Sequence, residues 1–400
     1  MNHTIIHLPK DRWQGHALPF GYRTEACYDV RIEQDPSGFT ISMERKPFDA
    51  PVEQRFSDAL YADWWPEACA WGVEKGGKLV AAIETCPETW SNRLRVTELW
   101  VDTAYRRQGI GHALMDVARE QARLERRRAI ILKTQSRNVP AIDFYLHEGF
   151  TLIGMDVCCY SNNDLENKDV RLEFGWFAER KARVSRQDVE IREERPEDRH
   201  AVERVMQRAF WNKYQKGGDD HYLVHRLRGI EEYLPHLSRV ALKDGEMIGA
   251  IFYTRAFVHD GATRHNILTF GPLGVSPEWQ GRGVGELLLE ETMRLAADAG
   301  WPGIVIFGEP DYYPRLGFKT CDQFGITTRD GTNFDAFMGI ELVPGGMNGI
   351  HGVFHQTDLL YGVPAEEAEA YGRNFPPLEK QYFPQQWVNG VPPMLAERTE

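Results

Sequence analysis

The chain has 400 residues, of which 42% are hydrophobic, and its formal net charge at pH 7 is −12. This length predicts two or three domains with cores of their own, and the negative charge argues against a nucleic-acid partner while mildly favouring cationic ligands. No signal-peptide pattern, no apolar run of about 18 residues and no Cys-x-x-Cys pair is found, so we expect a cytoplasmic protein with no membrane partner.

The first half of the chain has a clear order of predicted elements. A β-hairpin turns at Gly76-Gly77, a pair typical of primed two-residue turns. The apolar run 99–101 predicts a strand, which is followed by "RRQGIG" at 106–111 and then by a helical pattern. A short β-branched strand and a polar loop then lead to Tyr-x-x-x-Gly-Phe at 145–150.

The glycines before the helix indicate an anion site. A helix N-terminus exposes unpaired N–H groups, and glycines allow the backbone to turn tightly and to approach a ligand closely. Such a loop suits a pyrophosphate, although a turn needed only for packing is the alternative. The loop is not a Walker A motif, because no Gly-Lys-Ser/Thr follows, and it fits the Rossmann fingerprint poorly.

The second half repeats the same elements in the same order. A charged segment, Ala178–Arg199, forms the boundary, and Pro196 suits the first turn of the next helix. A hairpin across Asp244-Gly245 then precedes a strand at 273–275 and the loop "QGRGVG" at 280–285. A second Tyr-x-x-x-Gly-Phe begins at Tyr313, and the two glycine loops lie 174 residues apart.

With the pattern Arg/Gln-x-x-Gly-x-Gly/Ala in both loops, both halves resemble the GNAT superfamily of acyl-CoA-dependent N-acetyltransferases. The resemblance implies an α/β (mixed α+β) fold class: two tandem GNAT domains, each a central twisted mixed sheet flanked by helices. We expect domains at 1–182 and 186–345, and a C-terminal extension at 346–400 packed on the second domain. The tandem would act as a monomer with pseudo-dimeric domains, or as a homodimer.

The same resemblance implies acetyl-CoA as the acetyl donor. The loop amides would hold its pyrophosphate, and the strand before each loop, splayed from its neighbour, would hold the pantetheine and the thioester oxygen. Asn138 could also contact the cofactor, although a role as helix N-cap is equally open. The expected cofactor-binding residues are Leu99, Trp100, Val101, Arg106, Arg107, Gln108, Gly109, Ile110, Gly111, His112, Ala113, Asn138, Leu273, Gly274, Val275, Gln280, Gly281, Arg282, Gly283, Val284, Gly285 and Glu286.

The first half resembles streptothricin acetyltransferases more narrowly, through "YRRQGIGHALM", "LKTQSRNVPAIDFYLHEGF" and "YSNNDLENKDVRLEFGWF". The resemblance implies N-acetylation of a primary amine on a small cationic acceptor, with streptothricin as the best guess and antibiotic resistance as the role. Another amine (a polyamine, an amino acid or a protein lysine) and a non-catalytic acetyl-CoA sensor are the alternatives. The second half resembles a broad class of bacterial N-acetyltransferases.

Two residues of the first half are candidates for proton transfer. An alkyl amine is mostly protonated at neutral pH, so acetyl transfer needs a base, and the leaving thiolate needs an acid. Glu98 is the candidate base, unless it is a surface glutamate that pairs with Arg93 or Arg95. Tyr145 is the candidate acid, unless it is only a core residue of an amphipathic helix.

The second half keeps only part of this set. Tyr313 matches Tyr145, but Pro272 stands 174 residues after Glu98 and cannot be a base. We therefore expect the second domain to be weaker, orphan or structural, or to recruit a base from elsewhere.

For the acceptor we expect the segment Asp58–Ala68, "DALYADWWPEA", to be helix-like and to line the pocket. Asp63 could attract a cation, and Trp64 or Trp65 could cover it, although tryptophans that anchor the core are the alternative. The scattered histidines show no ligand spacing, so we expect no metal.

Overall fold

The computed structural model describes residues 3–177 and 181–386. Contacts divide the chain into two units, of which the first comprises residues 1–179 and 381–385 and the second residues 180–380 and 386–400. Residues 381–385, part of the extension that we expected on the second domain, thus belong to the first unit. Residues 387–400 of that extension lie outside the described residues.

Among the described residues, the first unit contains a seven-stranded mixed sheet in the order β1-β4-β5-β6-β7-β9-β8. In the described part of this sheet β6 and β7 pair in parallel, and the other neighbours are antiparallel. The strands are β1 (Ile6–Leu8), β4 (Cys69–Lys75), β5 (Lys78–Glu88), β6 (Arg93–Val101), β7 (Ala129–Gln135), β8 (Thr151–Asp156) and β9 (Arg171–Phe177).

Both faces of this sheet are covered. On one face, α2 (Ile110–Leu124) and α3 (Val139–His147) pack over a core that includes Trp71 and Phe383. Trp71 also donates a hydrogen bond from Nε1 to the carbonyl oxygen of Tyr382 at 3.1 Å. On the other face, α1 (Lys10–Trp13) and the base of a long hairpin enclose a second core cluster.

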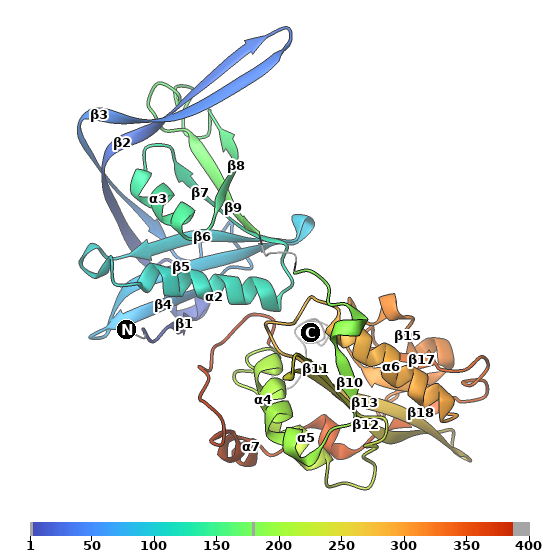
Figure 1. Ribbon diagram of the computed structural model, residues 1–400. Coiled ribbons are helices and arrows are strands. Elements are labelled where there is room, and N and C mark those ends of the chain that lie inside the picture. The colour runs from blue at the N-terminus through green and yellow to red at the C-terminus, as the bar shows by residue number, and fades with distance from the viewer. Residues whose placement is uncertain (1–2, 178–180, 387–400) are drawn as a thin grey trace. The chain divides into compact units, whose positions relative to one another are not determined.

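That hairpin is formed by β2 (Ala17–Asp35) and β3 (Gly38–Ala59), and it reaches past the other strands of the first unit (Figure 1). The helix expected at Asp58–Ala68 is therefore wrong. Pairing of Ala17 with Ala59 keeps the chain extended into this segment, and Tyr61 then adopts a left-handed backbone conformation with φ of 58°. Pro66 further disfavours a helix interior there.

The second unit repeats this architecture with a nine-stranded sheet, counted over the described residues. The main path is β10-β11-β12-β13-β14-β17-β15, and β18 pairs with both β12 and β16. The strands are β10 (Glu190–Arg192), β11 (Arg239–Lys243), β12 (Glu246–His259), β13 (Arg264–Val275), β14 (Gly303–Phe307), β15 (Lys319–Thr320), β16 (Ile326–Thr327), β17 (Phe337–Glu341) and β18 (Gly352–His355).

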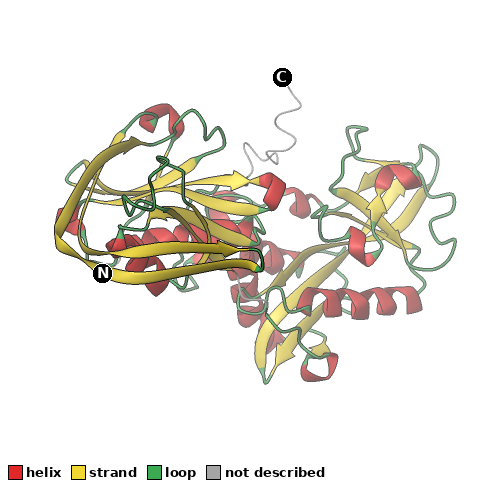
Figure 2. Cartoon of the chain, turned by 90° about the horizontal axis from the view of Figure 1, so that it is seen from above, coloured by secondary structure: helices red, strands yellow, loops and turns green. Residues whose placement is uncertain are grey.

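Helices cover both faces here too, and Figure 2 shows helices packed against strands in each unit. One face holds α6 (Val284–Asp298), and the other holds α4 (Arg199–Phe210) and α5 (Asp220–Leu227). Pro196 opens a 3-10 turn directly before α4, and α7 (Ala365–Gly372) packs on α5. The fold class is confirmed: each unit is a mixed sheet flanked by helices.

The two predicted hairpins are also confirmed. Gly76 and Gly77 have φ of 58° and 74°, and Asp244 and Gly245 have φ of 50° and 82°. Positive φ at both central residues is the signature of the primed turn that joins tightly twisted strands. In the part of the chain that the structure describes, no helix combines the length and the apolar character needed to cross a membrane.

Candidate functional site

The two glycine loops have the same backbone conformation. Gly109 (φ 82°) is the N-cap of α2, and Gly283 (φ 88°) is the N-cap of α6. Two residues earlier, Arg107 and Gly281 are also left-handed, with φ of 64° and 76°. The first glycine of the pattern is therefore needed for the turn, because a side chain disfavours this conformation.

The other residues of the pattern fix the loop in place. Arg106 donates from Nε to the carbonyl oxygen of Val101 at 3.0 Å, and Gln280 donates from Nε2 to the carbonyl oxygen of Val275 at 2.9 Å. Each side chain thus ties its loop back to the last residue of the preceding strand. A Cβ atom on Gly285 would lie 2.9 Å from the hydroxyl of Tyr312, so the second glycine permits close packing.

The central strands diverge in both units. The register of β6 with β7 covers only Arg93–Arg95, and that of β13 with β14 covers only Leu268, among the described residues. Each pair then opens toward the glycine loop, as the expected binding mode of acetyl-CoA requires. The splayed strands and the loop amides at a helix start suit an extended thioester ligand that carries a pyrophosphate.

Glu98 lies on β6 beyond the point where this strand leaves β7. Its cross-strand partner on β5 is Glu84, and a third carboxylate, Asp58 at the end of β3, lies close enough to raise its pKa. Arg93 and Arg95, the alternative partners that the sequence offered, pair with Glu88 instead, each at 2.6 Å. Glu98 therefore belongs to a carboxylate cluster at the splay, defined by Asp58, Glu84 and Glu98.

This cluster controls the protonation of Glu98. Burial raises the pKa of Glu98 to about 9, and the charges of Asp58 and Glu84 add to the effect. Glu84 is fully buried and accepts hydrogen bonds from the backbone N–H of Tyr61 and from the Thr97 hydroxyl, the latter at 2.7 Å. Since Glu84 is so held, Glu98 is the member of the cluster best able to exchange a proton.

Tyr145 is an electrostatic neighbour of Glu98. Its side chain lies in the main core of the first unit, with its ring 6.2 Å from both Phe150 and Phe174. Burial raises the pKa of the Tyr145 phenol, and the charge of Glu98 raises it further. Tyr145 is thus a core residue that stays protonated at neutral pH, as a proton donor must.

Glu98→Gln is expected to stabilise the protein at neutral and alkaline pH. The folded state binds a proton at Glu98 that the unfolded state releases above about pH 4.5, so stability falls as pH rises from there to about 9. Glutamine does not titrate, so the variant avoids the free energy needed to protonate Glu98 on folding. Its free energy of unfolding should therefore be about 2–3 kcal/mol higher at pH 7. Thermal unfolding should show the gain shrinking toward pH 4, and a gain that does not depend on pH would contradict this account.

Sequence reasoning missed two members of the carboxylate cluster. Asp58 is the first residue of the segment proposed for acceptor binding, but it was not itself proposed as a site residue. Glu84 belongs to no motif and could be predicted only as part of a strand. Trp64 is 71% exposed and Asp63 is also exposed, while Trp65 is half-buried, so Trp64 does not anchor the core.

Asn138 acts as the predicted N-cap of α3. Its side-chain oxygen accepts from the backbone N–H of Ala141 at 3.3 Å. This hydrogen bond satisfies one of the free donors at the helix start. A contact of Asn138 with cofactor stays a prediction.

In the second unit Pro272 lies on β13 and Tyr313 lies after β14, at the start of a 3-10 turn. The Tyr313 ring contacts Phe270 of β13, with 5.8 Å between ring centroids. A carboxylate not considered from the sequence, Glu309, lies in the turn that leads to Tyr313 and accepts a hydrogen bond from the Tyr214 hydroxyl at 2.8 Å.

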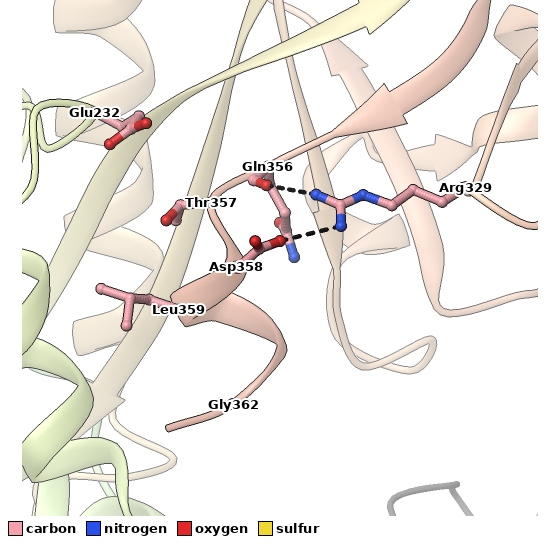
Figure 3. A pocket seen from close by; sticks show the side chains of 7 residues that line it. All are labelled: Glu232, Arg329, Gln356, Thr357, Asp358, Leu359 and Gly362. Carbon is pink, nitrogen blue, oxygen red and sulfur yellow. Dashed lines mark hydrogen bonds and ion pairs between the residues drawn. The ribbon is translucent and has the colours of Figure 1, made fainter. Parts of the chain in front are cut away.

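The second unit also has an open pocket of about 420 Å³, away from every predicted site residue (Figure 3). Arg329 crosses it and binds Asp358 at 3.1 Å and the carbonyl oxygen of Gln356 at 3.0 Å. Arg329 is the arginine among the residues that line this pocket, and it is already paired with Asp358. The lining residues therefore offer no unpaired cation to a ligand. It is lined by Glu232, Arg329, Gln356, Thr357, Asp358, Leu359 and Gly362.

Comparison with known proteins places a family model in each half. The model of the acetyltransferase (GNAT) family matches residues 38–150, and that of the acetyltransferase (GNAT) domain matches residues 235–320. The uncharacterized N-acetyltransferase YjhQ of Escherichia coli K12 is 33% identical over 31% of this chain and 66% of its own length. A streptothricin acetyltransferase of Escherichia coli is 29% identical over 28% of this chain and 64% of its own length.

These alignments thus span just under two thirds of both relatives. Among solved structures, the GNAT family N-acetyltransferase YhbS from Escherichia coli in complex with CoA is 21% identical. It covers 47% of this chain and 98% of its own, with a TM-score of 0.39. Each half of the chain therefore contains a GNAT acetyltransferase domain, at residues 38–150 and at residues 235–320.

Proposed function

We propose that the first unit transfers the acetyl group of acetyl-CoA to a primary amine of a small cationic acceptor. The observation that carries this proposal is the carboxylate cluster at the splay, whose Glu98 raises the pKa of the Tyr145 phenol. A cluster of carboxylates attracts an ammonium group, and a carboxylate next to a protonated phenol provides the base and the acid that acyl transfer to an amine needs.

Glu98 is the proposed base. The raised pKa of Glu98, about 9, brings its carboxylate close to the basicity of an alkyl amine, and an incoming ammonium favours the ionised form of Glu98. Glu98 then accepts a proton from the ammonium, the free amine attacks the thioester carbon, and the nitrogen releases its second proton to solvent as the N–C bond forms. Tyr145 donates its hydroxyl proton to the sulfur as the C–S bond breaks.

Loop residues 108–113 and strand residues 99–101 are the proposed binding elements for the donor. Their support is the splay of β6 from β7 and the left-handed turn at Gly109. In the second unit, residues 273–275 and 282–286 take the same place.

Streptothricin is the proposed acceptor, acetylated in the cytoplasm as a means of resistance. The support is the alignment with streptothricin acetyltransferases together with the acidic cluster, which suits a polycation. The acceptor-binding roles of Asp63, Trp64 and Trp65 remain part of this proposal. A different amine, or binding of acetyl-CoA without turnover, is the competing function.

The test is release of free CoA thiol from acetyl-CoA with streptothricin, spermidine and lysine as acceptors. Fast release with streptothricin that falls about 10- to 100-fold in Tyr145→Phe would support the proposal. If thiol were released only with another amine, that amine would take the place of streptothricin as the proposed acceptor. Tight acetyl-CoA binding without release from any acceptor would favour a sensor.

A further inference from the structure

In the second unit, aromatic and acidic side chains surround the ammonium group of Lys213. Its Nζ lies 3.0 Å from Oε1 of Glu309, 4.7 Å from the ring centroid of Tyr214 and 5.5 Å from that of Phe210. A carboxylate combined with aromatic faces is the environment in which proteins bind primary ammonium groups. Lys213 therefore occupies a binding site for the kind of group that an N-acetyltransferase modifies.

Side chains of this site reach both the end of β13 and the turn that follows β14. On the β13 side, the Phe210 ring lies 3.2 Å from the place where a Cβ atom of Gly274 would be. On the β14 side, Glu309 belongs to the turn that leads to Tyr313, whose backbone N–H donates to the Glu309 carbonyl oxygen at 3.3 Å. The Tyr313 ring packs on Gly308, where a side chain would collide with it.

Electrostatics link these groups into one site. The Tyr214 hydroxyl donates to Glu309, and burial together with the charges of Glu309, Tyr313 and Asp220 raises the pKa of this phenol. Burial and the charge of Asp219 also raise the pKa of Asp220 to about 8, while Lys213 opposes this shift. The ammonium of Lys213 is thus paired with Glu309 and lies within the electrostatic influence of Asp220.

We propose that Lys213 is an acetylation site of this protein, modified by the second unit itself. Glu309 takes a proton from the ammonium, and the free amine of Lys213 attacks the thioester carbon of acetyl-CoA. The N–C bond forms while the C–S bond breaks, Tyr313 protonates the leaving thiolate, and the nitrogen releases its second proton. The products are Nε-acetyl-lysine and CoA.

Glu309 thereby supplies the base that Pro272 cannot be. The position of Glu309 on the turn after β14, rather than on the central strand, explains why the repeat alone did not reveal it. The proposal rests on acetyl-CoA as the donor, as proposed for both units, and does not depend on the acceptor or the activity of the first unit.

The test is incubation of the full-length protein with isotopically labelled acetyl-CoA, followed by peptide mass spectrometry. Lys216 lies on the same loop and is exposed, so it reports purely chemical acetylation. We expect Lys213 to be acetylated about 100-fold faster than Lys216, at a rate that does not depend on protein concentration. Glu309→Gln and Tyr313→Phe should each slow the reaction at Lys213 about 10- to 100-fold.

Controls separate this site from the first unit. Tyr145→Phe should leave labelling of Lys213 unchanged, and Lys213→Arg should leave thiol release by the first unit unchanged. Titration with CoA should give two binding sites per chain in every variant, which checks that the second unit is folded. Labelling of Lys213 no faster than Lys216, labelling unaffected by both Glu309→Gln and Tyr313→Phe, or a single CoA site in the wild type would each overturn the proposal.

Discussion

Glu98→Gln is expected to lower kcat/KM for acetyl transfer by the first unit about 1000-fold. Glutamine keeps the size of the side chain but cannot accept the proton that the amine must lose, and general-base catalysis contributes about 10²- to 10⁴-fold. In the wild-type protein kcat/KM should rise with pH until about pH 9, because only ionised Glu98 is a base. The variant should lose this rising limb.

Initial rates of thiol release at a series of pH values measure both effects. Glu74→Gln is the matched control, since Glu74 is a partly exposed glutamate on β4 of the same sheet. The control should keep the wild-type rate and pH profile. If Glu98→Gln kept an unchanged pH profile, another group would have to be the base.

Arg228→Met is expected to lower the stability of the second unit by about 3–5 kcal/mol. The guanidinium is buried and bridges Glu194 and Glu203, with Nη2 at 2.6 Å from Oε1 of Glu194. All three side chains are less than 10% exposed, so methionine would leave two carboxylates buried without their cation. Because Arg228 follows α5 and Glu203 lies on α4, its loss should also loosen the packing of α4 against α5.

Calorimetric unfolding of the full-length protein checks this expectation. Arg226→Met is the control, because Arg226 forms an exposed ion pair with Glu367 at 2.9 Å, and such pairs contribute less than about 1 kcal/mol. A loss of similar size in both variants would mean that burial of the Arg228 network contributes little.

Local sequence signals were enough to predict the repeated framework. The primed turn at Gly76-Gly77, the left-handed glycine at the start of α2 and the strand before it depend on a few adjacent residues. The same signals recur in the second half, and their constant order made the tandem arrangement predictable. Each of these features is encoded within one turn or one helix end, where side-chain sterics decide the conformation.

The carboxylate cluster could not be predicted in the same way. Glu84 faces Glu98 only in one register of β5 with β6, and that register shifts at a bulge next to Glu84. Asp58 reaches them because β3 pairs with β2 up to Ala59, against the helix-like pattern of the following residues. Such proximity depends on long-range pairing, which residue spacing does not encode.

The place of residues 381–385 affects how the protein is made. These residues close the first core around Trp71, yet the ribosome adds them about 200 residues after residue 179. A nascent chain usually folds from its N-terminus, domain by domain. Here the first domain emerges with an incomplete core, in which the Trp71 indole lacks its contact with Phe383. The core stays incomplete until the second domain has been translated. Co-translational folding of the first domain is thus completed only after synthesis of the second.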